Sequence, residues 1–124
     1  FTYAIYPHAQ GWRAAGTVAQ AYKLNQPLLV QTGAQAGKNY SLASVDRSNV
    51  VIETIKQAES GEGIVVRMYE SENSLTKAKL TVNRPFEKAW ICNLLEEKES
   101  EGHVEGNVID VTLRPYEVVT VKIC

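Results

Sequence analysis

The fold of this chain is decided by one stretch, Asn49-Val-Val-Ile-Glu-Thr-Ile-Lys-Gln-Ala-Glu-Ser-Gly-Glu-Gly-Ile-Val-Val-Arg-Met-Tyr-Glu70. Two runs rich in β-branched residues, Val50–Gln57 and Ile64–Glu70, flank a turn that contains Gly61 and Gly63. Side chains branched at Cβ favour strands, and glycine readily adopts the positive φ that a tight turn requires. The stretch therefore predicts an antiparallel β-hairpin.

Downstream of the hairpin the sequence continues in short runs that are typical of strands. We predict strands at residues 77–82, 88–95, Val108–Leu113 and 116–123, and a loop in the acidic segment 96–107. Alternation in two of these runs places the following apolar side chains on an inward face: Ala78, Leu80, Val82, Val119, Val121 and Ile123.

The N-terminal part has a different pattern. Residues 1–6 are aromatic and β-branched and predict a strand that ends at Pro7, and residues 28–30 predict a second, short strand. Apolar residues recur at helical spacing in residues 12–24, which predicts a helix, and residues 31–38 predict a loop. We therefore expect one all-β domain over residues 1–124, an antiparallel β-sandwich of about seven or eight strands with one short helix near the N-terminus.

Composition excludes several classes of partner. The chain has 124 residues, with 13 basic and 14 acidic side chains and a net charge of −1. Neither sign of charge is concentrated, and no apolar run is long enough to span a membrane, so we expect no nucleic-acid partner and no membrane partner. Because the chain opens on Phe1 and on strand-like sequence, we expect it to be a fragment of a longer protein.

Two cysteines do not form a disulfide framework. Cys92 lies within an apolar run and Cys124 is the last residue. We expect Cys92 to be a free, buried thiol, which favours a reducing compartment.

The carboxylates do not suggest an active site. Hydrolysis of a glycosidic bond needs two carboxylates held on either side of that bond. We expect the acidic side chains of this chain to be solvated, because they lie mid-strand, near turns or on the acidic loop: Glu53, Glu59, Glu62, Glu70, Glu72, Glu96, Glu97, Glu99 and Glu101. Only two histidines are present and no Cys-x-x-Cys occurs, so we predict no metal site and no catalytic residue.

Aromatic residues gather near the N-terminus at Tyr3, Tyr6, Trp12 and Tyr22, with His8 between them. They would either pack in the core, where the helix meets the sheet, or form a platform on which sugars stack. Because His8 follows Pro7 in a loop, its ring could face a partner surface. We regard Tyr6, His8 and Trp12 as candidates for a substrate-proximal position or a domain interface.

Five segments, spread over nearly the whole chain, carry a resemblance to one family. They are Phe1-Thr-Tyr-Ala-Ile-Tyr-Pro-His8 with Gly11-Trp12, Ala21-Tyr-Lys-Leu-Asn-Gln-Pro-Leu28, the hairpin of residues 51–70, Cys92-Asn-Leu-Leu-Glu96, and Arg114-Pro-Tyr-Glu-Val-Val-Thr120. Together and in this order they resemble the C-terminal end of glycoside hydrolase family 38 α-mannosidases, especially the cytosolic and bacterial branch.

The resemblance implies a parent enzyme that removes terminal α-D-mannosyl residues by a zinc-dependent, retaining mechanism. It also implies that the metal ligands, the aspartate nucleophile and the acid/base lie in an N-terminal domain outside this chain, so that this fragment alone is inactive. The expected partners are the parent's own catalytic and helical domains, and the expected location is cytoplasmic. A homo-oligomer interface stays open, as do two other classes of protein: an independent carbohydrate-binding module and a protein-interaction sandwich.

Overall fold

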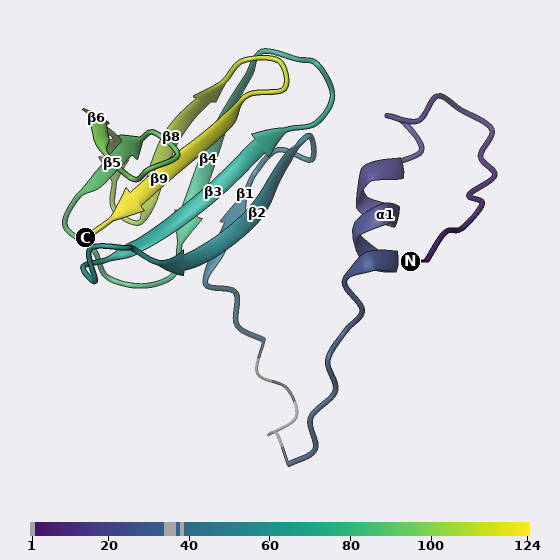
Figure 1. Cartoon of the computed structure of the whole chain (residues 1–124), viewed down its shortest axis with the longest axis horizontal. Helices are drawn as coiled ribbons and strands as arrows, with labels where there is room; N and C mark the ends of the chain where they lie inside the picture. Colours follow the sequence, from purple (N-terminus) through teal and green to yellow (C-terminus); the bar gives the residue numbers. More distant parts are fainter. Residues whose placement is uncertain (1, 34–36, 38) are drawn as a thin grey trace. The chain divides into compact units, whose positions relative to one another are not determined.

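The structure of the chain, a computed structural model, describes residues 2–33, 37 and 39–124. The chain divides into two compact units, Phe1–Asn39 and Tyr40–Cys124 (Figure 1). The first unit contains the helix α1, Thr17–Asn25, and the second contains the strands.

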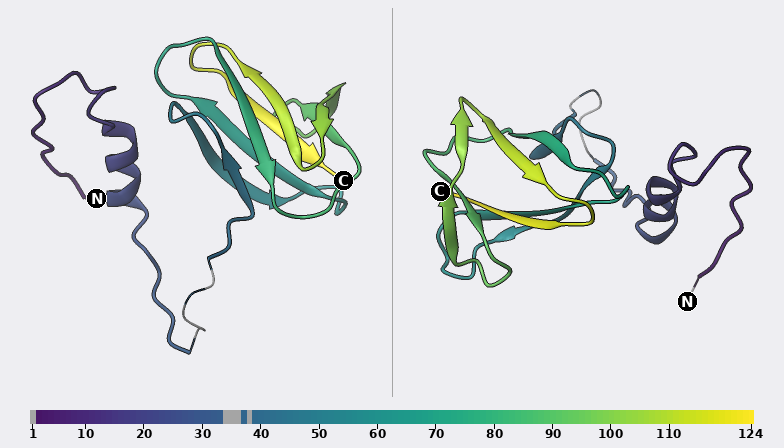
Figure 2. Two further views of the ribbon diagram at one scale, coloured as in Figure 1. Left: turned by 180° about the vertical axis from the view of Figure 1, so that it is seen from behind. Right: turned by 90° about the horizontal axis from the view of Figure 1, so that it is seen from above.

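The second unit is a two-layered antiparallel β-sandwich (Figures 1 and 2). In spatial order, the four-stranded sheet consists of β1 (Ala43–Val45), β4 (Thr76–Val82), β8 (Val108–Leu113) and β7 (His103–Glu105). The five-stranded sheet consists of β2 (Val50–Gln57), β3 (Ile64–Glu70), β9 (Val118–Ile123), β5 (Ala89–Cys92) and β6 (Lys98–Glu101). The predicted fold class is confirmed, and the described residues form nine strands rather than seven or eight.

The core lies between the two sheets and is built by alternation. In β4 buried and more exposed residues alternate from Thr76 to Val82, as the sequence predicts. The inward faces of the two sheets form one cluster of buried apolar side chains, which includes Met68 and Val121 from the five-stranded sheet and Leu80, Ile109 and Leu113 from the four-stranded sheet. Burial of a side chain of this size stabilises the fold by about 1.5–3 kcal/mol, so this interior holds the two layers together.

The predicted hairpin is present as β2 and β3, which pair in antiparallel register from Val50 opposite Glu70 to Gln57 opposite Ile64. A bulge between Ile52 and Thr54 shifts the register within β2. Both turn glycines have positive φ, 81° at Gly61 and 82° at Gly63, and the Ala58 amide donates to the Gly63 carbonyl.

The predicted loop at residues 96–107 is wrong, because this segment contains β6 and β7. Every residue of β6 is exposed, since the strand forms one edge of the five-stranded sheet. Charged side chains are common on sheet edges, so the composition of an edge strand is easily mistaken for that of a loop. Gly102 separates β6 from β7, and at this point the chain passes from one sheet to the other. The strand predicted at residues 88–95 is shorter, Ala89–Cys92.

The first unit differs most from prediction. The helix begins at Thr17 rather than at residue 12, because Gly16 adopts a left-handed conformation with φ 64° and residues 12–16 form turns. Residues 2–6 and 28–30 do not form strands, because a strand pairs its backbone with that of a neighbouring strand and neither segment belongs to a sheet among the described residues. Phe1 and part of the predicted loop at residues 31–38 lie outside the described residues. No helix in the described part of the chain is long and apolar enough to cross a membrane.

The turn of the hairpin offers a test of the backbone geometry. A Cβ at Gly63 would lie 2.1 Å from the Ile123 carbonyl oxygen, whereas a Cβ at Gly61 would meet nothing within 4 Å. Both glycines have positive φ, so Gly61→Ala introduces only the backbone strain of about 1–2 kcal/mol. We expect Gly63→Ala to lower the free energy of unfolding by at least about 1 kcal/mol more than Gly61→Ala, as measured by urea denaturation. Equal losses in the two variants would contradict this packing of the turn against β9.

Candidate functional site

The three candidate residues near the N-terminus lie in the first unit, where two of them come together. The rings of Tyr6 and His8 are 5.5 Å apart between centroids, and the Tyr6 hydroxyl donates to the Ala15 carbonyl over 3.1 Å. The His8 imidazole Nδ1 is hydrogen-bonded to the Gln10 carbonyl. Trp12 follows in the next turn, and the Arg13 guanidinium stacks 4.6 Å from the centre of its ring. Their substrate-proximal or interface role stays a prediction.

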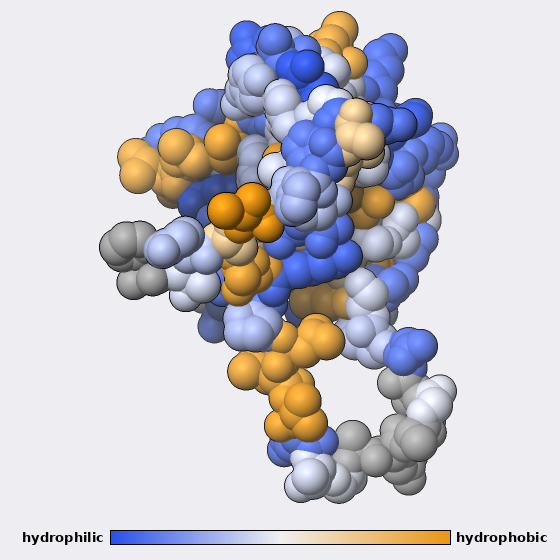
Figure 3. All heavy atoms as spheres, turned by 90° about the vertical axis from the view of Figure 1, so that its right-hand side faces the viewer, coloured by the Kyte–Doolittle hydropathy of each residue, from blue (hydrophilic) through white to orange (hydrophobic). Residues whose placement is uncertain are grey.

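Of the two alternatives for the N-terminal aromatic rings, packing in a core is wrong for Tyr3, Tyr6 and Trp12, which are 83%, 45% and 39% exposed. No residue of α1 is buried, so the helix builds no core of its own. The segment Leu28-Leu29-Val30 is almost fully exposed and forms an apolar stretch on the surface (Figure 3). The first unit therefore presents apolar side chains that a soluble surface rarely shows in such a run.

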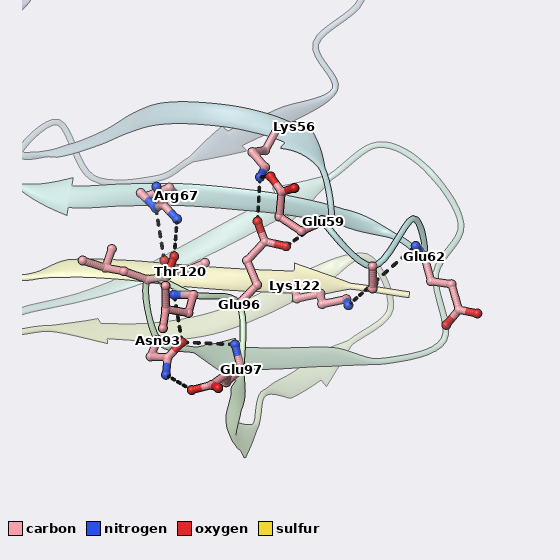
Figure 4. A network of polar contacts seen from close by, with 12 residues as sticks. Lys56, Glu59, Glu62, Arg67, Asn93, Glu96, Glu97, Thr120 and Lys122 are labelled. Carbon is pink, nitrogen blue, oxygen red and sulfur yellow. Dashed lines mark hydrogen bonds and ion pairs between the residues drawn. The ribbon is translucent and has the colours of Figure 1, made fainter.

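A network of charged side chains lies on the outer face of the five-stranded sheet (Figure 4). The Lys56 ammonium on β2 forms ion pairs with Glu59 and with Glu96, the second over 2.7 Å. The other carboxylate oxygen of Glu96 accepts a hydrogen bond from the Glu59 amide over 2.7 Å. The hydrogen bonds from Lys56 and from this amide hold the pKa of Glu96 below its ordinary value. Glu96, predicted to be solvated, instead ties the β5–β6 loop to the β2–β3 turn.

The β5–β6 loop is ordered by the side chain of Asn93. Its Oδ1 accepts hydrogen bonds from the Leu95 and Glu97 amides over 2.9 and 3.1 Å, while its Nδ2 donates to the Glu97 carboxylate. From β3, the Arg67 guanidinium donates to the Leu94 carbonyl over 3.2 Å. The loop is therefore held across the outer face of the sheet rather than extended into solvent.

A second carboxylate, Glu70 at the end of β3, is fully buried, so its predicted solvated position is wrong. It accepts hydrogen bonds from the Asn49 side-chain amide over 2.8 Å and from the backbone amides of Glu72 and Tyr116 over 2.8 and 3.1 Å. Burial raises the pKa of Glu70, but the hydrogen bonds from Tyr116, Asn49, Glu72 and Ser74 outweigh it and lower the pKa to about 2. Glu70 joins the start of β2, the β3–β4 turn and the β8–β9 turn.

The β8–β9 turn that Glu70 contacts is Arg114-Pro115-Tyr116-Glu117, closed by a hydrogen bond from the Glu117 amide to the Arg114 carbonyl. Tyr116 has φ 58°, a conformation that favours glycine at this position of a turn that follows proline. The bond from its amide to Glu70 holds this conformation in place. The Arg114 guanidinium pairs with the Glu117 carboxylate over 2.7 Å and lowers its pKa.

These carboxylates are suited to structural roles. A glycosidase acid must be protonated near neutral pH, which requires a raised pKa. The pKa values of Glu70, Glu96 and Glu117 are all lowered, so each of these groups is ionised at neutral pH. Among the described residues no three His, Cys, Asp or Glu side chains are close enough to hold a metal ion, and so this part of the chain does not fit a zinc site.

Both cysteines are free, Cys92 buried and Cys124 exposed, in agreement with the prediction. Burial raises the pKa of the Cys92 thiol, so it is protonated and unreactive at neutral pH.

Comparison with known proteins now defines the family. The family model of the glycosyl hydrolases family 38 C-terminal β-sandwich domain matches residues 49–121, which covers both sheets except β1 and the end of β9. The chain belongs to this family. The predicted resemblance is confirmed.

Three curated relatives are similar over almost the entire chain. Alpha-mannosidase 2C1 of Mus musculus is 37% identical over 95% of this chain, and alpha-mannosidase 2C1 of Homo sapiens is 35% identical over 97%. Alpha-mannosidase G of Dictyostelium discoideum is 29% identical over 98%. In each case the chain spans only 12% of the length of the relative.

The buried carboxylate gives a pH-dependent prediction. Because the pKa of Glu70 falls from 4.5 to about 2 on folding, its stabilisation is complete above pH 4.5 and is lost as the pH falls toward 2. We expect Glu70→Gln to lower the free energy of unfolding at pH 7 by about 2 kcal/mol and to flatten its dependence on pH within this window. Urea denaturation of the 124-residue chain at several pH values measures both effects.

The matched control is Glu62→Gln on the exposed hairpin turn, which should change the free energy of unfolding by less than about 0.5 kcal/mol. A Glu70→Gln variant as stable at pH 7 as Glu62→Gln would contradict the proposed role of the buried carboxylate.

Proposed function

We propose that this chain is the C-terminal structural domain of an α-mannosidase and that the parent protein hydrolyses terminal α-D-mannosyl residues. The observation that carries the proposal is the match to relatives named alpha-mannosidase over 95–98% of this chain, at only 12% of their length. The zinc, the nucleophile and the acid/base of a retaining mechanism belong to the remaining polypeptide. In this proposal the enzyme acts in the cytoplasm, where reducing conditions keep cysteines such as Cys92 and Cys124 as free thiols.

The proposed task of the domain is to order the rest of the enzyme. Its ionised carboxylates are engaged in hydrogen bonds and ion pairs that join turns and strands, which suits a rigid support. The exposed segment Leu28-Leu29-Val30 gives the first unit an apolar surface for contacts with the parent's own catalytic and helical domains. Burial of these three side chains at an interface would contribute several kcal/mol.

An assay with an aryl α-mannoside tests the proposed activity. We expect the intact parent protein to release the aryl group and to lose this activity when a chelator removes zinc. The 124-residue chain alone should release none, with or without added zinc. Turnover by the chain alone would contradict the assignment of the catalytic residues to the remaining polypeptide, and an inactive, zinc-loaded parent would contradict the proposed function.

The N-terminal corner is tested by His8→Ala in the intact protein. We propose that Tyr6, His8 and Trp12 face the catalytic domain, so we expect the substitution to lower either aryl-mannosidase activity or the melting temperature. Lys23→Ala, at an exposed position of α1, is the control and should change neither. A His8→Ala protein that matches the control in both measurements would remove this role.

A further inference from the structure

The segment Leu28-Leu29-Val30 has the most exposed large apolar side chains in the described part of the chain, at 94%, 98% and 92%. Its backbone amides and carbonyls form no hydrogen bond with another described residue. The chain leaves the C-terminal end of α1 in an extended path through this segment (Figure 1). Three consecutive apolar side chains are rarely left on a surface that meets only water. The segment is therefore suited to contact with another surface.

The order of residues in the segment is typical of a strand that is buried on both faces. Pro27 has no amide hydrogen and disfavours the helical conformation at Gln26, so α1 does not continue into the segment. Successive side chains of a strand point to opposite faces, so three apolar residues in a row place apolar groups on both faces. A sheet with one solvated face instead has strands in which apolar and polar residues alternate, as in β4.

The edges of the sandwich do not offer a sheet of this kind. Its edge strands are β1 and β7 in one layer and β2 and β6 in the other, and each of them has exposed residues. If the segment were added to one of these edges, Leu29, or Leu28 together with Val30, would lie on a solvated face. The core cluster of the sandwich is built from the second unit alone, so it does not require the segment either.

The curated relatives contain polypeptide that could supply the missing sheet. Their similarity to this chain covers 95–98% of it, so it includes most of the first unit, although the family model of the sandwich begins at residue 49. This chain spans 12% of the length of each relative. The first unit therefore occurs in longer proteins, in which most of the polypeptide lies outside the matched part.

We propose that Leu28-Leu29-Val30 pairs as a strand with a sheet of the same polypeptide outside residues 1–124, and that this sheet is covered on both faces. The inference rests on the proposed function, because it requires a longer parent chain. The backbone groups of the segment bind the edge of that sheet, and its side chains are buried on both faces. Pro27, which has no amide hydrogen to donate, is suited to the position before such a strand.

Hydrogen–deuterium exchange in the unmodified proteins tests the backbone pairing. We expect the amides of Leu28, Leu29 and Val30 to exchange at least about a hundredfold more slowly in the intact parent protein than in the 124-residue chain. The strand β3 is the control, because it pairs with β2 and β9 and should exchange slowly in both. Fast exchange of the segment in the parent would overturn the proposal. Protection already present in the 124-residue chain would also overturn it, because the cover would then come from within this chain or from a second copy.

Cysteine labelling tests whether both faces are covered. We expect Leu28→Cys and Leu29→Cys each to react with a maleimide at least about tenfold more slowly in the parent than in the 124-residue chain. Lys77→Cys, at an exposed position of β4, is the matched control and should react equally fast in both. Peptide mass spectrometry separates these sites from the exposed native Cys124.

The pattern of labelling distinguishes the other ways of covering the segment. Protection at only one of the two positions would indicate a contact on one side and would overturn the proposed burial on both faces. Protection that disappears on dilution of the parent, as a second copy would give, would overturn the assignment to the same polypeptide. If a cysteine variant does not fold, the exchange of the unmodified protein decides the proposal.

The same preparations separate this inference from the proposed function. Hydrolysis of an aryl α-mannoside by a parent in which the segment is unprotected would remove the added strand and leave the function. Protection of the segment in a zinc-loaded parent that hydrolyses no α-mannoside would remove the function and leave the added strand.

Discussion

The pairing of β3 with β9 is the constraint on which the rest of the sandwich depends. The two strands are matched from Ile64 opposite Ile123 to Tyr69 opposite Val118, although at least 49 positions along the chain separate each residue from its partner. The hairpin strand β2 pairs only with β3 within its sheet, and β5 pairs with β9. Without this central contact, both halves of the five-stranded sheet lose their attachment. The inward side chains of β3 and β9 then have no common surface on which the other layer can pack.

Polar groups fix the positions of the loops and turns, which burial in the apolar core alone does not determine. Burial of apolar area is non-directional and does not by itself position loops, whereas a hydrogen bond to a carboxylate does. Glu70 is hydrogen-bonded to the start of β2, the β3–β4 turn and the β8–β9 turn at one end of the sandwich. Glu96 binds the β5–β6 loop to the β2–β3 turn on the outer face of the five-stranded sheet. Glu70 and Glu96, which were predicted to be solvated, are thus part of the scaffold, and their lowered pKa values reflect that role.

The sandwich itself could be predicted from sequence because alternation and turn glycines are local signals. The runs that became β2, β3, β4 and β8 were predicted with nearly the observed bounds. The strand β6 could not be found, because a fully exposed edge strand carries the same charges as a loop. The start of α1 was misplaced because the helical spacing of apolar residues continues through Gly16, where the backbone adopts a left-handed conformation that ends the helix on its N-terminal side.

The polar sites were harder to predict than the fold. The burial of Glu70 depends on donors from Asn49 and Tyr116, which approach it only after distant strands have paired. One local signal was available: Glu70 ends a strand next to a turn and stands on the inward side of the alternation that begins at Val66 and Met68. The exposure of Tyr6 and Trp12 could not be predicted either. An aromatic residue in a short segment indicates a buried position, and the sequence pattern is the same whether the surface that covers the ring lies in this chain or outside it.

The bulge in β2 has a consequence for the behaviour of the domain in concentrated solution. β2 is the longest strand at either edge of the two sheets, and a long, regular edge can recruit the edge of another molecule into a continuous sheet. The register shift between Ile52 and Thr54 interrupts the repeat of free amides and carbonyls along this edge, and the charge of Lys56 follows shortly after. An incoming strand can therefore match only part of β2 at a time. The irregularity that breaks the ladder within the domain also protects it from aggregation through that edge.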